Sequence, residues 1–222
     1  MPGRPGYAAL SEAARARHLD VFGLLHPGPE DGAPPGTRTL LLLGPDGARF
    51  WPALTASPEW RDGAPDPVDR WSARVIGGWA ASLGAQAVFP SDGPPYPPFL
   101  AWARASGRAW PSPVGLLVHD TAGLWVSYRA ALALPWRVEG PELPQASPCE
   151  SCAEQPCRTA CPVDALSAEA YLVEACRAHV SSPEGAPCMS GGCRVRAACP
   201  VSRRHGRPDV QSAYHMRAFA RP

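Results

Sequence analysis

The sequence contains no lysine and no asparagine, and its single isoleucine is Ile76. Its 21 permanently basic residues are therefore all arginines. Without lysine the chain cannot form a Schiff base, bind phosphate through a Walker lysine or use a lysine general base. Arginine does not deprotonate in proteins, so it does not replace lysine as a base. Enzyme classes that depend on these lysines are excluded.

Long apolar runs are also missing. The longest aliphatic stretch, TLLLLGP at 39–45, is far shorter than the roughly 20 residues that cross a bilayer. The first 25 residues have no basic segment followed by an apolar core, so they do not predict a secretory signal. We therefore expect a cytoplasmic protein without a membrane segment. In that reducing compartment, eight thiols indicate metal ligation rather than four disulfides.

Cysteine is absent from residues 1–140, which hold all eight tryptophans. The eight cysteines all lie between Cys149 and Cys199. A chain of 222 residues can hold one medium domain and a smaller one, and 45% apolar residues suit a globular protein. We predict an N-terminal sheet domain at 1–140 and a metal-binding module at 141–222, joined by the Pro-rich segment GPELPQASP at 140–148.

The N-terminal part alternates helical and extended patterns, which predicts an α+β fold built on an α/β sheet domain. Helices are expected over 10–25, 67–83 and 97–107, where apolar residues recur at helical spacing. Strands are expected at RTLLLLGP and AQAVFP. Residues 114–126 predict two further strands joined by a turn at 120–123. Asp66 is expected to cap the second helix.

The cysteines form two groups of four, and each group ends in Cys-Pro-Val. The first group is Cys149, Cys152, Cys157 and Cys161, and the second is Cys176, Cys188, Cys193 and Cys199. In two-cluster ferredoxins, the Cys-Pro cysteine of each run ligates the other cluster. That rule predicts one [4Fe-4S] cluster on Cys149, Cys152, Cys157 and Cys199. It predicts a second cluster on Cys161, Cys176, Cys188 and Cys193.

The alternative is zinc, because tetrahedral four-cysteine sites also use closely paired cysteines. The first run departs from the usual ferredoxin spacing, since four residues separate Cys152 from Cys157 where two are usual. Two independent zinc sites have no need for the repeated Cys-Pro ending. We therefore expect a redox protein that takes single electrons from a donor protein and passes them through two [4Fe-4S] clusters to an acceptor, either a partner protein or a cofactor in the N-terminal domain. A zinc-stabilised interaction module without redox activity is the alternative.

The segments CESCAEQPCRTACPVDAL, EACRAHVSSPEG and CMSGGCRVRAACPVS resemble the cluster-binding part of epoxyqueuosine reductases, and DGPPYPPFLAWARASGRAW is more weakly similar. The resemblance implies two [4Fe-4S] clusters in a ferredoxin-like module, a nitroreductase-like N-terminal domain and cobalamin as a further cofactor. It also implies Asp92 as the catalytic acid, although Asp92 lies about one residue out of register. The family's N-terminal part is longer and its tRNA-binding extension is absent, so epoxyqueuosine reduction itself is not carried over.

Other polar residues carry two readings each. Asp92 lies in a turn-forming sequence, so a solvated turn residue competes with a general acid. His119, at the end of an expected strand, is interpreted first as a hydrogen-bonded structural histidine and second as a residue that faces a cofactor. His179 lies three residues after Cys176 and could replace a missing ligand, but eight cysteines already fill eight ligand positions. Residues 194–222 contain seven arginines and one acid, Asp209. We interpret them first as a solvated basic tail, next as a docking patch for an acidic redox partner, and third as a nucleic-acid contact.

Overall fold

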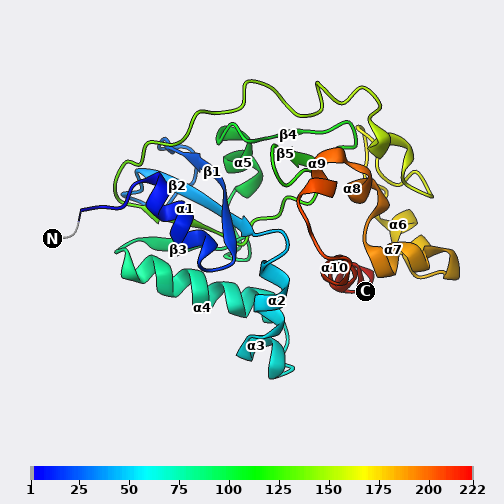
Figure 1. Ribbon diagram of the computed structural model, residues 1–222, viewed down its shortest axis with the longest axis horizontal. Helices are drawn as coiled ribbons and strands as arrows, with labels where there is room; N and C mark the ends of the chain where they lie inside the picture. Colours follow the sequence, from blue (N-terminus) through cyan, green and yellow to red (C-terminus); the bar gives the residue numbers. More distant parts are fainter. Residues whose placement is uncertain (1–2, 222) are drawn as a thin grey trace. The chain divides into compact units, whose positions relative to one another are not determined.

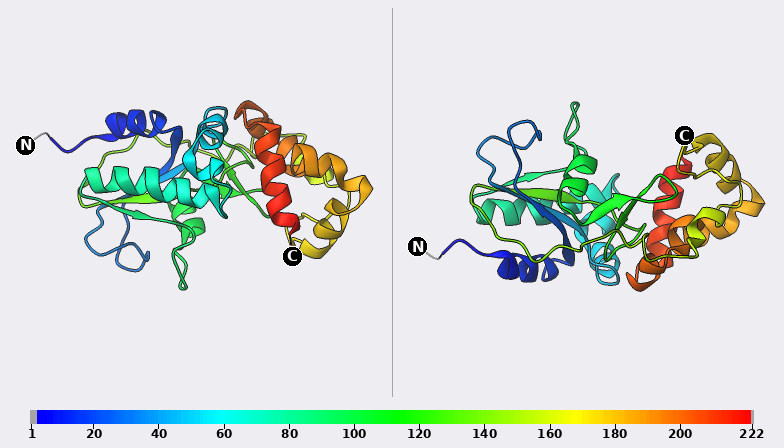
Figure 2. Two further views of the ribbon diagram at one scale, coloured as in Figure 1. Left: turned by 90° about the horizontal axis from the view of Figure 1, so that it is seen from below. Right: turned by 90° about the horizontal axis from the view of Figure 1, so that it is seen from above.

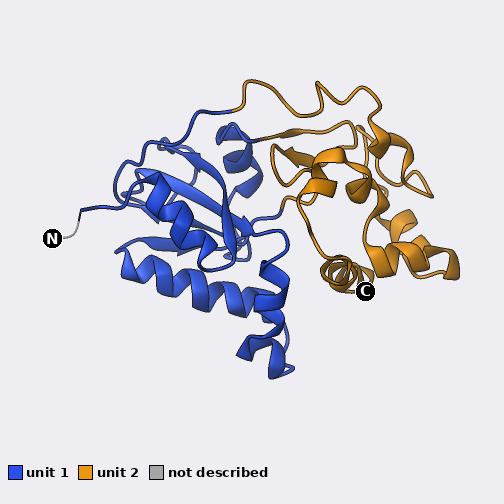
Figure 3. Cartoon of the chain, viewed as in Figure 1, with its two compact units in different colours: residues 1–108, 127–143 blue, residues 109–126, 144–222 orange. Residues whose placement is uncertain are grey.

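The computed structural model describes residues 3–221 (Figure 1). The chain forms two compact units (Figure 3). Unit 1 comprises residues 1–108 and 127–143, and unit 2 comprises residues 109–126 and 144–222. The last boundary between the units, at 143–144, falls inside the Pro-rich segment 140–148. Residues 109–126, however, also belong to unit 2. The two units therefore do not correspond to a single cut in the sequence.

Unit 1 is built on a four-stranded antiparallel sheet in the order β1-β2-β6-β3. The strands are β1 (Leu19–Leu25), β2 (Thr39–Pro45), β6 (Ala130–Leu134) and β3 (Gln86–Val88). Every residue of β2 and β6 is buried, so both faces of the central strands are covered. This explains why TLLLLGP is continuously apolar rather than alternating. The mixed α+β class predicted from the sequence is confirmed.

Five helices accompany this sheet. They are α1 (Tyr7–Arg15), α2 (Phe50–Thr55), α3 (Pro58–Arg61), α4 (Pro67–Ser82) and α5 (Phe99–Ala105). Helix α4 packs against β3 and β6 through the buried stripe that includes Trp71, Ile76 and Trp79. The strand at 39–45 and the helices at 67–83 and 97–107 are confirmed. Asp66 precedes α4, but its side chain makes no capping hydrogen bond.

The expected helix over 10–25 is wrong in its second half. Helix α1 ends at Arg15, and Leu19–Leu25 is strand β1. The change of direction occurs at His18, whose φ of 60° is left-handed and stops a helix. Pairing of β1 with β2 along nearly its whole length outweighs the local helical spacing. Tertiary hydrogen bonding thus decided the conformation of this segment.

The carboxylate of Glu59 in α3 is a buried charge that pairs with Arg74 in α4. Arg74 donates to both Glu59 oxygens, one of them at 3.0 Å from Nη2. These hydrogen bonds lower the pKa of Glu59 to about 2. A carboxyl whose pKa falls on folding stabilises the protein above its unfolded pKa, and this stability is lost as the pH falls through the folded pKa. The pair therefore contributes above about pH 4.5 and fades toward pH 2.

Replacing Glu59 with glutamine should lower the free energy of unfolding at pH 7 by about 1–2 kcal/mol, because Arg74 is half exposed and solvent screens the pair. The difference from wild type should shrink steadily below pH 4. Urea unfolding followed by tryptophan fluorescence at several pH values measures it. Glu139→Gln, which breaks an exposed ion pair with Arg137, is the control and should change stability by less than about 0.5 kcal/mol. A constant difference from pH 7 to pH 3 would contradict the role of the carboxylate.

Unit 2 begins with a two-stranded hairpin of β4 (Ala109–Pro111) and β5 (Leu117–His119). The expected hairpin around 120–123 is wrong in its partner: β5 pairs with β4 before it, and no strand follows Gly123 until β6 in unit 1. The turn at 120–123 is present. It is closed by the backbone bridge between His119 and Gly123.

The rest of unit 2 is a series of short helices and loops. These are the 3-10 turns η1 (Pro156–Thr159) and η2 (Pro183–Gly185) and the helices α6 (Val173–Val180), α7 (Ala186–Gly191), α8 (Arg194–Ala198), α9 (Pro200–Arg204) and α10 (Asp209–Ala220). Helix α10 lies beside α7 (Figure 2). Within residues 3–221, none of the helices is both long and apolar enough to cross a bilayer.

Cysteines form part of the small core of unit 2. Its buried members are Val114, Val118, Leu124, Cys157, Leu166, Val195, Cys199 and Val201. Cys149, Cys161 and Cys193 pack against this core from its edge. A core this small, in which thiols replace aliphatic side chains, contributes little burial energy by itself. Unit 2 therefore has the composition of a module that needs an additional crosslink.

Candidate metal centre

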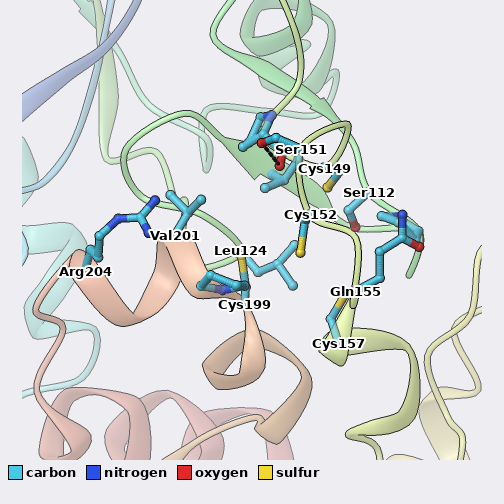
Figure 4. Close-up of a pocket in the computed structure, with 14 residues that line it drawn as sticks. Ser112, Leu124, Cys149, Ser151, Cys152, Gln155, Cys157, Cys199, Val201 and Arg204 are labelled. Atoms are coloured by element: carbon cyan, nitrogen blue, oxygen red, sulfur yellow. Dashed lines mark hydrogen bonds between the residues drawn. The ribbon is translucent and has the colours of Figure 1, made fainter.

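Four cysteines from three segments line a cavity in unit 2. Cys149 and Cys152 lie in the loop before η1, Cys157 lies within η1, and Cys199 lies at the junction of α8 and α9. The cavity has a volume of about 230 Å³. Figure 4 shows the four side chains arranged around one space. Leu124, Val118 and Val201 supply apolar walls.

The other four cysteines line a second cavity. Cys161 follows η1, Cys176 lies in α6, Cys188 lies in α7, and Cys193 precedes α8. This cavity is smaller, about 30 Å³, and its other walls are mainly apolar. A group larger than a single ion enters it only if the thiol side chains rotate outward. The two cavities together account for all eight cysteines, and no cysteine lines both.

The sets of cysteines that share a cavity are those predicted from the crossed Cys-Pro rule. Cys199, from the second run, joins the first run's Cys149, Cys152 and Cys157. Cys161, from the first run, joins Cys176, Cys188 and Cys193. We call these sets the first and the second quartet. Chain order alone would have grouped Cys161 with Cys157, only four positions away.

The thiols within each quartet influence one another electrostatically. Burial raises the pKa of Cys149 and Cys157, and the nearby Cys199 and Cys152 raise the pKa of both further. Burial likewise raises the pKa of Cys176 and Cys188, with further contributions from Cys193 and Cys161. Each effect stays inside its quartet. Four thiolates in one such space repel one another unless cations neutralise them, so metal binding would release protons.

The first quartet lines a much larger cavity than the second, about 230 Å³ against about 30 Å³. Within residues 3–221, no three His, Cys, Asp or Glu side chains lie close enough together to ligate one metal ion. Four thiolates on one zinc ion, each about 2.3 Å from it, would bring their sulfurs within roughly 4 Å of one another. A cubane cluster binds each thiolate through a different iron and so holds the sulfurs farther apart. All eight cysteines are free thiols.

No family model matches the chain, and searches of curated proteins and of solved structures return no match. The resemblance to epoxyqueuosine reductases therefore stays a prediction.

Several polar groups face the second quartet. The backbone N–H of Ala165 donates to Sγ of Cys161 at 3.2 Å. The Tyr171 hydroxyl donates to Cys176, and this hydrogen bond opposes the rise that burial causes in the pKa of that thiol. His179 lines the second cavity, and its Nε2 is buried without a hydrogen-bond partner among residues 3–221. Such donors stabilise sulfur ligands that carry negative charge.

The remaining candidates lie elsewhere. Asp92 is exposed in a turn of unit 1, where its Oδ2 accepts a hydrogen bond from the Phe89 N–H at 2.7 Å. It lines neither cysteine cavity. His119 is fully buried in unit 2, and its Nδ1 accepts from the N–H groups of Thr121 and Ala122 at 3.2 Å. Both residues thus stabilise turns.

Two residues that hold the first cavity together were not predicted. Ser202 in α9 accepts a hydrogen bond at its Oγ from the Leu124 N–H at 2.8 Å. Arg196 in α8 is partly buried and donates to the Leu124 carbonyl at 2.7 Å. Both contacts join segments more than 70 positions apart. The only local signal was Gly123, which allows the turn to approach Ser202 closely.

Proposed function

We propose that the chain is an iron–sulfur redox protein that holds a [4Fe-4S] cluster in each cysteine quartet and passes single electrons between partner proteins. Bound clusters would supply a reversible one-electron couple. The chain's own residues would ligate them, exclude water with an apolar wall and donate hydrogen bonds to sulfur. A ferredoxin-like arrangement of unit 2 is part of this proposal.

The observation that carries the proposal is the crossed membership of the two quartets. The Cys-Pro ending of each run predicted, by the rule for two-cluster ferredoxins, that Cys199 and Cys161 would exchange places. Two separate cavities group the cysteines in that way. An exchange of this kind is characteristic of paired ferredoxin clusters.

The residues present fit such a group in chemical terms. Each quartet offers four soft thiolate donors, which select iron–sulfur clusters, zinc or copper over oxygen-preferring ions. The first cavity has an apolar wall and enough room for a multi-atom cluster. The orphaned Nε2 of His179 gains a partner if a sulfur-rich group occupies the second cavity. Bound metal would also crosslink the small core of unit 2.

We also propose that unit 1 is a nitroreductase-like sheet domain and that it receives electrons. A cavity of about 440 Å³ in unit 1 is lined by residues that include His26, Asp31, Arg108 and Glu139. This is the size of a site for a small organic ligand. It is too small to enclose a whole cobalamin. An absorbance titration with cobalamins tests whether unit 1 makes the chain an oxidoreductase or leaves it an electron carrier.

Purification without oxygen tests the proposal directly. We expect a brown protein with a broad absorbance band near ~400 nm and about eight iron and eight sulfide ions per chain. Dithionite should bleach the band, and the reduced protein should show the electron paramagnetic resonance of reduced cubanes. Iron, acid-labile sulfide and zinc are measured on the same sample.

A colourless protein with about two zinc ions per chain would overturn the proposal in favour of the zinc-stabilised module. The matched control is Cys157→Ala together with Cys188→Ala, which removes one buried ligand from each quartet. This variant should lose the colour and the sulfide under identical conditions. Colour that persists in it would show that the cysteine quartets are not the ligands.

A further inference from the structure

An open groove of about 600 Å³ lies in unit 2 beside Cys161. Its charged lining residues are Arg194 and Arg203, and no acidic residue lines it. The remaining lining residues include Cys161, Pro162, Thr159 and small alanines. The groove is therefore a concave surface with positive charge at its walls and little side-chain bulk at its floor.

The two arginines of the groove are not neutralised by the protein. Both are exposed, and none of the ion pairs found within residues 3–221 involves either of them. Arg203 is held over the groove by a hydrogen bond of 3.3 Å from its Nε to the Ala197 carbonyl. Arg196 and Arg207 of the same segment are committed elsewhere, to the Leu124 carbonyl and to the Trp125 ring. Arg196 and Arg207 therefore make contacts within unit 2, whereas Arg194 and Arg203 are exposed at the groove.

The groove and the second cysteine cavity share a wall. Cys161, Pro162 and Arg194 line both. A molecule seated in the groove would therefore lie against Cys161, a member of the second quartet. The small residues of the floor let a partner approach Cys161 closely. A close approach favours electron transfer, because its rate falls steeply with distance.

From this juxtaposition we propose that the groove is the docking site of an acidic one-electron carrier protein that reduces the chain at the second quartet. The inference rests on the proposed function. One electron leaves the reduced carrier, which is oxidised by one electron, and one electron is gained at the group held by Cys161, Cys176, Cys188 and Cys193. No bond is made or broken. Arg194 and Arg203 attract the partner's carboxylates and orient its redox centre toward Cys161.

The lining of the groove favours a protein over a nucleic acid. Single-stranded nucleic acids bind basic grooves that also offer aromatic side chains for base stacking. The described lining of this groove contains no aromatic residue. Carboxylates on a complementary protein surface need only the two guanidinium groups, which bind them in a bidentate manner. Arginine in place of lysine makes both positions suitable for that geometry.

The test is the rate at which photoreduced flavodoxin, an acidic one-electron carrier, reduces the full-length iron-loaded protein in stopped flow. The variant Arg194→Glu/Arg203→Glu should lower the second-order rate constant at least about 10-fold at low salt. The wild-type rate should fall with ionic strength, and the rate of the variant should depend on it much less. Arg104→Glu/Arg217→Glu is the matched control, since it makes the same change in net charge at two exposed arginines outside the groove. The control should retain the rate within about 2-fold.

Iron content and reduction by dithionite are measured on every variant, so a lost site is distinguished from a lost partner. Unchanged iron and dithionite reduction together with a selective loss of flavodoxin reduction supports the docking site. Equal rates in the two double variants overturn it and leave the proposed function intact. Binding of a single-stranded RNA that is lost in the groove variant, with no effect on flavodoxin reduction, also overturns it. Absence of iron from the wild-type protein instead removes the proposed function, and the docking site with it.

Discussion

Cys199→Ala should empty the first cavity of metal, although Cys199 belongs to the second run of cysteines in the sequence. We expect the iron content to fall from about eight to about four atoms per chain, because one of the two proposed four-iron clusters loses a ligand. The physical reason is that Cys199 lines the same cavity as Cys149, Cys152 and Cys157 and is buried there. Iron and sulfide analysis after oxygen-free purification measures the loss. The paramagnetic resonance of the reduced protein identifies which cluster remains.

Pairs of substitutions make this test independent of how much each single change destabilises unit 2. Cys149→Ala/Cys199→Ala should lose no more iron than either single variant, since both ligands serve one cluster. Cys161→Ala/Cys199→Ala should lose nearly all of it, since one ligand is removed from each quartet. Non-additivity of this kind reports which residues act as a unit.

The control variants pair two cysteines from the same run of the sequence. If the two runs bound separate metals, Cys149→Ala/Cys161→Ala would behave as a pair within one site, and Cys188→Ala/Cys199→Ala as a pair within the other. We expect the reverse, with both of these variants losing nearly all iron. Iron loss that groups by run rather than by quartet would contradict the crossed arrangement and with it the main support for the proposed function.

The grouping of the cysteines could be predicted because it follows from a local pattern and a general rule. Cys161 and Cys199 are each followed by proline, which has no N–H and turns the chain away from the preceding residue. The structure gives Cys199 extended φ and ψ angles of −61° and 125° before Pro200 starts α9. The local sequence at each Cys-Pro junction thus sets the direction in which the chain leaves the site.

The walls of the cavity could not be predicted, because they depend on contacts between distant segments. Residues 109–126 resembled part of the N-terminal sheet domain, since they are apolar and carry turn signals. In the structure they belong to unit 2, where Val118 and Leu124 line the first cavity. Nothing local to 109–126 distinguishes a hairpin that joins a sheet from one that lines the first cysteine cavity. The same limit explains the mistaken helix at 19–25, which pairs with a strand about 20 positions later.

The arginine-rich segment 194–222 differs from its prediction, because its composition does not reveal which arginines make contacts inside the protein. Seven arginines and one acid indicated a solvated tail, but residues 194–220 contain the helices α8, α9 and α10. Arg196 is partly buried and donates to a backbone carbonyl, and Arg207 stacks on Trp125 with 5.0 Å between its Cζ and the ring centroid. A charge count cannot tell a guanidinium that joins two segments from one that faces solvent. Only the second kind is available to a partner.

Replacing Gly123 with alanine is the second change from which we expect a large effect. It should lower both the stability of unit 2 and the amount of metal that unit 2 binds. Gly123 has a φ of 58°, which disfavours any residue with a Cβ atom. A Cβ atom there would lie 2.4 Å from the backbone nitrogen of Ser202 and 2.6 Å from its Oγ. A backbone atom cannot rotate away, so Gly123→Ala must separate the turn from α9. The Leu124 N–H would then lose its acceptor on Ser202.

We expect Gly123→Ala to lower the free energy of unfolding of unit 2 by about 2–5 kcal/mol, from about 1–2 for the left-handed backbone and the rest from the steric conflict. Because Ser202 lies three residues after Cys199, the iron of the first quartet should be lost preferentially. Urea unfolding and iron analysis measure the two effects.

Gly84→Ala is the matched control for this prediction, because Gly84 has a similar φ of 62° and open space around the position of a Cβ atom. It should show the backbone cost alone and retain all the iron. Ser202→Ala isolates the other component, since it removes the acceptor of a buried N–H without a clash and should cost about 1–3 kcal/mol. If Gly123→Ala were no worse than Gly84→Ala, the close contact between the turn and α9 would not exist. Leu124 would then have no fixed place in the wall of the first cavity, and an open cavity there could not shield a cluster from water.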